Sequence, residues 1–212
     1  MRHKLRFLNL ILIVIFIFSF TACTTPKTAA ETTAQPAIEK GEYNIGETGP
    51  AGGLIFYVNL DYKADGWRYL EAAPSNQSEG ELWDYYREKD VATGATAIVV
   101  GTGKANTQTI VKALGSGTIK VNDQEVAISY AAKLCDDLTL NGYSDWFLPS
   151  KDELNLMYVI LKESSLGGFV SDTYWSSSED EVYNAWNQYF GSGEQYSAAQ
   201  RKKAMVRAVR SF

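Results

Sequence analysis

The chain has 212 residues and a formal net charge of −5, and its only histidine is His3. Removal of the first 22 residues as a leader takes away three basic residues and no acidic ones, so the formal charge becomes about −8. Such a chain has no general attraction for nucleic acid and cannot form a Ser-His-Asp set, a Cys-His set or a histidine-containing zinc site. We therefore expect a binding protein with no catalytic residue, cofactor or metal.

The first 22 residues have the three parts of an export signal. Basic residues precede an apolar run from Leu10 to Phe18, and small residues stand immediately before Cys23. The run is shorter than the roughly 18 apolar residues that a spanning helix needs, and a plain secretory signal does not explain Cys23. The segment resembles a bacterial lipobox, in which the cysteine is acylated, although Phe20 replaces the usual leucine. Residues 1–22 are thus predicted to be a lipoprotein signal peptide.

Residues 23–41 are predicted to be a flexible tether. Thr24 to Lys40 is rich in Thr, Ala and Pro and has one apolar branched residue, Ile38, so it cannot build a core. The lipid on Cys23 would hold the protein in the bacterial cell envelope. Thr24 is not the aspartate that commonly retains lipoproteins in an inner membrane, which favours the outer membrane or cell surface. Residues 42–212 are predicted to form one folded domain.

Two strands are predicted at the start of this domain. Leu54 to Val58 is a short apolar, β-prone run, which suits a strand buried on both faces. Trp67 to Ala72 is the second, and Pro74 stops it. Residues 75–89 are polar with interspersed aromatics and are predicted to form a loop.

Three helices are predicted next. The first is capped by Asn106 or Thr107 and ends at Leu114. The second has one apolar face at helical spacing, formed by Ala127, Tyr130, Ala131, Leu134, Cys135 and Leu138. The third begins at Ser150, which forms a capping box with Glu153. The apolar face of the third consists of Leu154, Met157, Tyr158 and Leu161.

The last part of the domain is predicted to be β structure. From Thr173 onward, short β-prone pieces are separated by Gly and Ser, and the chain ends in an extended piece, Met205 to Phe212. A strand, then helices, then several strands is the order of an α+β domain.

Several motifs together resemble one family. They are GPAGG at 49–53 before LIFY at 54–57, LEAAP at 70–74, GTGKANT at 101–107, GYSDWFLPS at 142–150 with DEL at 152–154, YWSSSE at 174–179 and VRAVR at 206–210. This combination resembles the bacterial DUF1566 family, related to the C-terminal domain of the Legionella collagen-like adhesin. The resemblance covers about residues 44–212 and implies a C-type-lectin-like fold. It further implies two helices flanking short, mostly antiparallel sheets, pairing of the first and last strands, and exposed strands and loops between Trp175 and Phe190.

The chain departs from its relatives at two places. Family members often have a second cysteine where Ala208 stands, so Cys135 is expected to be a small buried apolar residue. Calcium-dependent lectins use a Trp-Asn-Asp triplet, whereas residues 186–188 read Trp-Asn-Gln. Calcium-bridged sugar binding is therefore not expected.

Two alternatives to simple ligand binding stay open. A carbohydrate-active enzyme would need paired carboxylates, but the acids at 136–137 and 152–153 are adjacent in predicted helices and point about 100° apart. Asp180 and Glu194 are the acids left to test. A polysaccharide-binding adhesin would use the basic residues at 201–203. The motif at 101–104 lacks the spacing of a phosphate-binding loop and is better explained as a loop that enters a helix.

The segment from Tyr183 to Ala199 is the candidate binding surface. Nine of its 17 residues are Tyr, Ser, Gly or Asn, and this composition is typical of paratopes; an ordinary polar β-hairpin is the plainer interpretation. Together with its flanking motifs, the segment also resembles the variable region of proteins diversified by diversity-generating retroelements, near residues 180–204. The predicted contacts to a protein or glycan ligand are Tyr183, Asn184, Trp186, Asn187, Tyr189, Ser192, Glu194, Tyr196 and Ser197, with Trp186, Tyr189 and Tyr196 as anchors.

Overall fold

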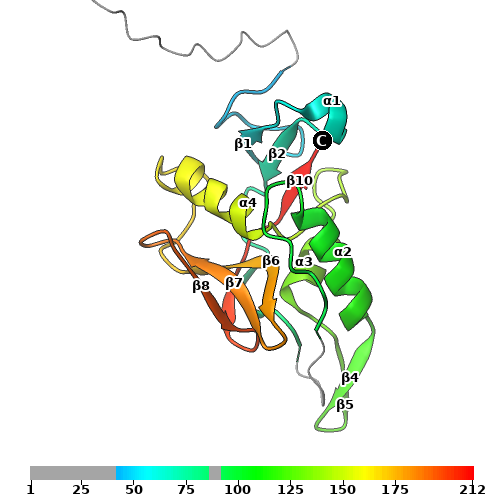
Figure 1. The fold of residues 1–212 in the computed structure, drawn as a ribbon. Coiled ribbons are helices and arrows are strands. Elements are labelled where there is room, and N and C mark those ends of the chain that lie inside the picture. The colour runs from blue at the N-terminus through cyan, green and yellow to red at the C-terminus, as the bar shows by residue number, and fades with distance from the viewer. Residues whose placement is uncertain (1–41, 86–91) are drawn as a thin grey trace, which may run out of the picture. The chain divides into compact units, whose positions relative to one another are not determined.

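The first predicted strand is confirmed as β1 (Leu54–Val58) in the computed structural model, which describes residues 42–85 and 92–212. The leader, Cys23 and the tether lie outside the described residues. Four α-helices and three mostly antiparallel sheets make up the described part, in agreement with the predicted α+β class (Figure 1). Within that part, no helix has the length and apolarity needed to cross a membrane.

A three-stranded sheet contains the first and the last strand of the domain. It contains β1, β2 (Tyr69–Ala72) and β10 (Val209–Ser211) in the order β1-β2-β10, with α1 (Tyr62–Asp65) between β1 and β2. The expected direct pairing of the first and last strands is wrong. The chain turns back through α1, so β2 pairs with β1 on one side and with β10 on the other.

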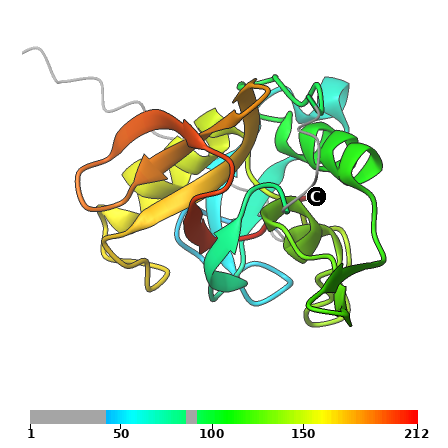
Figure 2. The same ribbon diagram turned by 90° about the horizontal axis from the view of Figure 1, so that it is seen from below.

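The larger sheet has the strand order β3-β9-β6-β7-β8. Its strands are β3 (Ser78–Leu82), β6 (Thr173–Glu181), β7 (Asn184–Tyr189), β8 (Glu194–Ala199) and β9 (Lys203–Val206). The prediction of a loop at 75–89 is wrong for the residues of β3. This edge strand forms by pairing with β9, which is far away in the sequence. The prediction that the chain forms exposed strands and loops from Trp175 onward is wrong for β6. That strand lies between β9 and β7 inside the larger sheet, on which helices pack (Figure 2). It contacts both α2 (Gly103–Leu114) and α4 (Lys151–Leu156), and its centre is buried.

Two predicted helix boundaries are wrong. The helix expected from Asn106 begins at Gly103, and the Asn106 side chain is instead buried and donates to the Ala97 carbonyl at 2.6 Å. The helix expected from Ala127 is only α3 (Ala131–Asp136). A hairpin of β4 (Thr118–Val121) and β5 (Gln124–Ala127) uses the preceding residues. Positive φ values at Asn122 and Asp123 form its tight turn.

The predicted capping box is confirmed at the start of α4. The Ser150 hydroxyl accepts from the Glu153 backbone N–H, and the Ser150 N–H donates to the Glu153 carboxylate. The helix then continues as a π-helical segment, Met157–Lys162. Leu154, Met157 and Leu161 are buried, as predicted.

The core is divided into two apolar clusters. Trp146 and Trp175 lie in one, and Tyr174 lies in the other; all three are buried, as predicted for core aromatics. Cys135 is a free, fully buried cysteine beside Ala132, and burial raises the pKa of its thiol. It therefore acts as a small apolar residue, in agreement with the sequence prediction.

Three buried glutamates bind the backbone of glycine-containing turns. Glu71 accepts from the N–H groups of Ala51 and Gly53 at 3.1 and 2.8 Å. Glu153 accepts from Gly101 at 2.8 Å, and a Cβ atom at the nearby Gly103 would collide with its carboxylate. Glu179 accepts from the N–H groups of Thr93 and Gly94 at 3.0 and 2.8 Å. Each carboxylate thus satisfies backbone N–H donors of a turn.

Arg210 connects the β1-β2-β10 sheet to the loop that precedes α4. Its guanidinium lies 3.2 Å from the buried Glu71 carboxylate and donates to Asp145 at 2.8 and 3.0 Å. Its Cζ also lies 4.1 Å from the Tyr143 ring centroid. Burial alone would raise the pKa of Asp145, but the hydrogen bonds and charge of Arg210 hold it below the ordinary value.

The first prediction concerns this ion cluster. Substitution Arg210→Met should lower the free energy of unfolding by about 3–5 kcal/mol, because it leaves Glu71 buried without its cation. Urea denaturation measures the change. The matched control is Lys133→Met, which removes an exposed pair with Asp137 and should cost about 0.5 kcal/mol or less. Equal, small losses in both variants would contradict the assigned role of Arg210.

The second prediction concerns Glu153 and pH. Burial raises its pKa from 4.5 to about 7, against the opposing effect of backbone hydrogen bonds from Ser150, Gly101 and Gly103. The native state therefore binds this proton more tightly than the unfolded chain does. The Glu153 contribution to stability should increase as pH falls from about 7 to about 4.5 and should be lost as pH rises through 7.

Glu153→Gln separates this effect from the other carboxylates, because glutamine keeps one acceptor for the Ser150 N–H of the capping box and does not titrate. Its NH2 group faces the Gly101 N–H, which causes a loss of stability that does not change with pH. The stability difference between the wild type and Glu153→Gln should shift in favour of the wild type at lower pH, by about 1–3 kcal/mol over the titration. Thermal melting between about pH 5 and pH 8 measures it. Parallel pH profiles for the two proteins would show that Glu153 does not change its proton affinity on folding.

Candidate ligand-binding surface

The predicted contact residues lie on the β7–β8 hairpin and its turns. β7 pairs with β6 on one side and with β8 on the other, and β8 is the edge strand at the opposite side of the larger sheet from β3 (Figure 1). Successive side chains of a strand point to opposite faces, and directly paired residues share a face. The hairpin therefore has two distinct surfaces.

The first surface is named here the tyrosine face. Tyr189 lies between Thr173 and Glu194 in one row of paired residues, and Asn187 lies between Trp175 and Tyr196 in the next. The name tyrosine face is kept for the end of this surface nearer the turn at Ser192, which comprises Thr173, Trp175, Asn187, Tyr189, Glu194 and Tyr196. Further along the same side of the hairpin, the paired Ala185 and Ala198 are buried in the core. Tyr189 and Tyr196 are 39% and 36% exposed. The Tyr189 ring lies against Gly191, where a Cβ atom would not fit.

The second surface, named here the helix face, packs on α4. Lys151 places its Nζ atom 3.4 Å from the centroid of the half-buried Trp186 ring. Gln188 donates to Asn155 Oδ1 at 2.8 Å, and Gln195 donates to the Lys151 carbonyl at 2.8 Å. These contacts fix the hairpin to the helix, so Trp186 has a structural contact in addition to its partial exposure.

The structure does not bring all nine predicted residues together. Asn184, Trp186 and Ser197 share the helix face, so they point away from Tyr189, Glu194 and Tyr196. Tyr183, 61% exposed, precedes β7, and Ser192 lies in the turn after it, so these two are at opposite ends of the hairpin. Asn187 is only 2% exposed, which contradicts its predicted place on an exposed surface. The composition of the segment correctly indicated a surface hairpin, but it could not show which residues lie on which of the two faces.

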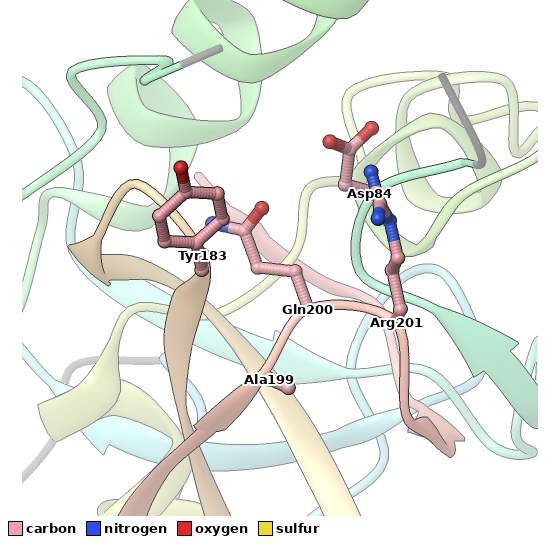
Figure 3. A pocket seen from close by; sticks show the side chains of 5 residues that line it. All are labelled: Asp84, Tyr183, Ala199, Gln200 and Arg201. Atoms are coloured by element: carbon pink, nitrogen blue, oxygen red, sulfur yellow. The ribbon is translucent and has the colours of Figure 1, made fainter. Parts of the chain in front are cut away.

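A small cavity of about 150 Å³ lies at the Tyr183 end of the hairpin. It is lined by Asp84, Tyr183, Ala199, Gln200 and Arg201 (Figure 3). The Tyr183 ring stands on one side and Asp84 with Arg201 on the other. A carboxylate, a guanidinium and an aromatic ring can together contact a small polar group. The Gln200 amide, 4% exposed, lies 3.3 Å from the Asn184 carbonyl and fixes this end of β7.

Sequence reasoning missed Asp84 and Gln200 as pocket residues. Asp84 follows β3, the strand predicted as a loop, and its position depends on long-range pairing. Gln200 follows directly after the segment that was singled out by composition. Tyr183 was a predicted contact, and Arg201 belongs to the basic run that was weighed for polysaccharide binding, so these two lining residues carried a signal in the sequence.

The carboxylates considered for catalysis are far apart. Glu194 pairs with Tyr189 at one end of β7, whereas Asp180 lies next to the pair Glu181–Asn184 at the other. At about 3.4 Å per residue, the length of β7 exceeds the roughly 5–10 Å that separates the two acids of a glycosidase. In residues 42–85 and 92–212, no cluster of three or more His, Cys, Asp or Glu side chains could hold a metal ion.

The comparisons with known proteins identify the domain. The sequence model of the Lcl C-terminal domain family, formerly DUF1566, matches residues 101–210. The match runs from the start of α2 to β10 and includes the whole β7–β8 hairpin. No curated protein matches the sequence. Because the match covers more than half of the chain, the protein belongs to the Lcl C-terminal domain family.

Proposed function

We propose that this protein is a lipid-anchored protein of the bacterial cell envelope whose domain binds an extracellular protein or glycan. The observation that carries the proposal is the exposure of three tyrosines, Tyr183, Tyr189 and Tyr196, on one hairpin whose opposite face is fixed to α4. The contact surface consists of the exposed part of the tyrosine face and the separate cavity at the Tyr183 end of the hairpin.

Physical reasons favour this surface for binding. Tyrosine supplies a large contact area with few rotatable bonds, and aromatic side chains dominate binding energy in known interfaces. The hydrogen bonds of Gln188, Gln195 and Gln200 hold the hairpin in place. A rigid hairpin loses little conformational entropy when a ligand binds.

We also propose the finer features that the resemblance implies. The described arrangement of α2 and α4 around the larger sheet is compatible with a C-type-lectin-like fold. The exposed positions of the hairpin, Tyr183 and Glu194 among them, could vary without disturbing the core, as retroelement diversification requires. A near-identical copy of codons 180–204 beside a reverse transcriptase gene would support diversification, and its absence would contradict it.

The third prediction tests the binding surface. Substitution of Tyr183, Tyr189 and Tyr196 with alanine, singly and together, should weaken capture on arrays of glycans and extracellular protein domains by about tenfold or more for the strongest anchor. Stability should change by about 1 kcal/mol or less for each, since these side chains are exposed. Thermal melting and array binding are measured on the same samples of the full chain.

Val126→Ala is the control for this experiment. Val126 is an exposed apolar residue in the separate β4–β5 hairpin, so its loss should change neither binding nor melting appreciably. Unchanged binding of the triple tyrosine variant would contradict the proposal. A collapse of melting with every single substitution would show that these rings hold the fold instead.

The fourth prediction tests the anchor. Mass spectrometry of the N-terminal peptide from exported protein should find residue 23 as the first residue and carrying acyl chains. Cys23→Ser should shift the protein from the membrane fraction to the soluble fraction, because several acyl chains are needed for stable anchoring. An unmodified Cys23, or a wild-type protein that is soluble after export, would contradict the lipoprotein assignment.

A further inference from the structure

The Tyr196 side chain crosses strand β7. Its hydroxyl lies 2.9 Å from the Thr173 hydroxyl. Tyr196 belongs to β8 and Thr173 to β6, and β7 lies between these strands. The Tyr196 ring must therefore lie over β7 on the tyrosine face, with its outer side exposed to solvent.

Asn187 of β7 lies beneath this crossing. It pairs directly with Tyr196 on one side and with Trp175 on the other, so the three side chains share a face. Its Oδ1 atom is buried and has no hydrogen-bond partner in the structure. The Trp175 indole N–H cannot serve it, because that group donates to the Glu81 carbonyl at 3.0 Å.

An unpaired buried acceptor is costly. The penalty for leaving such a group without a partner exceeds the net contribution of an ordinary neutral hydrogen bond. A single hydroxyl contact with Thr173 holds the far end of the Tyr196 side chain in this arrangement. Rotation of the Tyr196 side chain would break its contact with Thr173 and expose Asn187 Oδ1. This oxygen would then accept a hydrogen bond from a ligand.

We propose that Tyr196 is a hinged cover over a binding position at Asn187, and that a neutral sugar ring of a glycan occupies it when the cover opens. This inference rests on the proposed function and specifies its ligand class. Asn187 and Glu194 offer acceptors, Thr173 offers a hydroxyl, and Tyr189 and Tyr196 offer aromatic rings. The six positions of the tyrosine face include no basic side chain, so a hydroxyl-rich neutral ligand suits them better than an anionic one.

The test uses the full chain and an array of immobilised neutral oligosaccharides built from glucose, galactose, mannose and N-acetylglucosamine. Asn187→Leu should weaken binding to the best of these by about tenfold or more, since it removes the acceptor. Its melting temperature should be equal to that of the wild type or higher, because the unpaired oxygen is gone. Tyr196→Phe keeps the ring but frees it from Thr173, and should strengthen binding by about threefold to tenfold through a larger open population.

Ser197→Ala is the matched control, since Ser197 is exposed on the same strand but on the helix face, and it should bind normally. Three results would overturn the inference: no sugar bound by the wild type, normal sugar binding by Asn187→Leu, or a melting temperature several degrees lower for Asn187→Leu. Weaker binding by Tyr196→Phe would refute the role of Tyr196 as a cover.

The array of protein domains separates this inference from the proposed function. Capture of a protein that Tyr183→Ala weakens, with no sugar bound, would overturn the sugar site alone. Capture of nothing on either array would overturn both.

Discussion

Hydrogen bonds from backbone N–H groups to buried glutamate carboxylates hold the loops of this domain in place. The three acids, Glu71, Glu153 and Glu179, are each nearly or fully inaccessible to solvent. Hydrogen bonds to an ionised carboxylate are roughly twice as strong as neutral ones, and the pKa of about 7 means that Glu153 makes them mainly above that pH. Glu71 and Glu153 each stand in one sequence motif and bind a glycine-containing turn from another, and Glu179, in a third motif, binds the turn at Thr93 and Gly94. Motifs far apart in the sequence are therefore complementary in space, which gives a physical reason for their joint occurrence.

These carboxylates also position the candidate binding surface. Glu153 fixes the start of α4, against which the helix face of the hairpin packs. Glu179 belongs to β6, the strand that pairs with β7, and binds the loop at residues 93–95. The hairpin is thus supported by a helix on one face and a buried strand along one edge. On its other face Trp175 and Asn187 are buried, whereas Tyr189 and Tyr196 are exposed, and Tyr183 is exposed at the end of the hairpin.

The sequence predicted those elements whose signals are local. The apolar run of β1 and the capping box of Ser150 with Glu153 needed only neighbouring residues, and both are confirmed. Features that depend on distant pairing were missed, such as β3, which exists because β9 lies beside it. The candidate surface shows the same limit. Composition identified the right segment, but only the register of β7 against β8 reveals that Trp186 and Tyr196 face opposite ways and that Asn187 is covered.

The most direct test of the proposed binding surface is NMR mapping of the full chain with the tightest-binding ligand from the glycan and protein-domain arrays. Backbone amide shifts should change along β7, β8 and the Tyr183 turn, and should stay constant in the β1-β2-β10 sheet. The Asn187 side-chain amide should shift with them if the ligand is a sugar. Shifts centred on another surface, such as the β4–β5 hairpin, would contradict the proposal that the tyrosine face is the binding site of this domain.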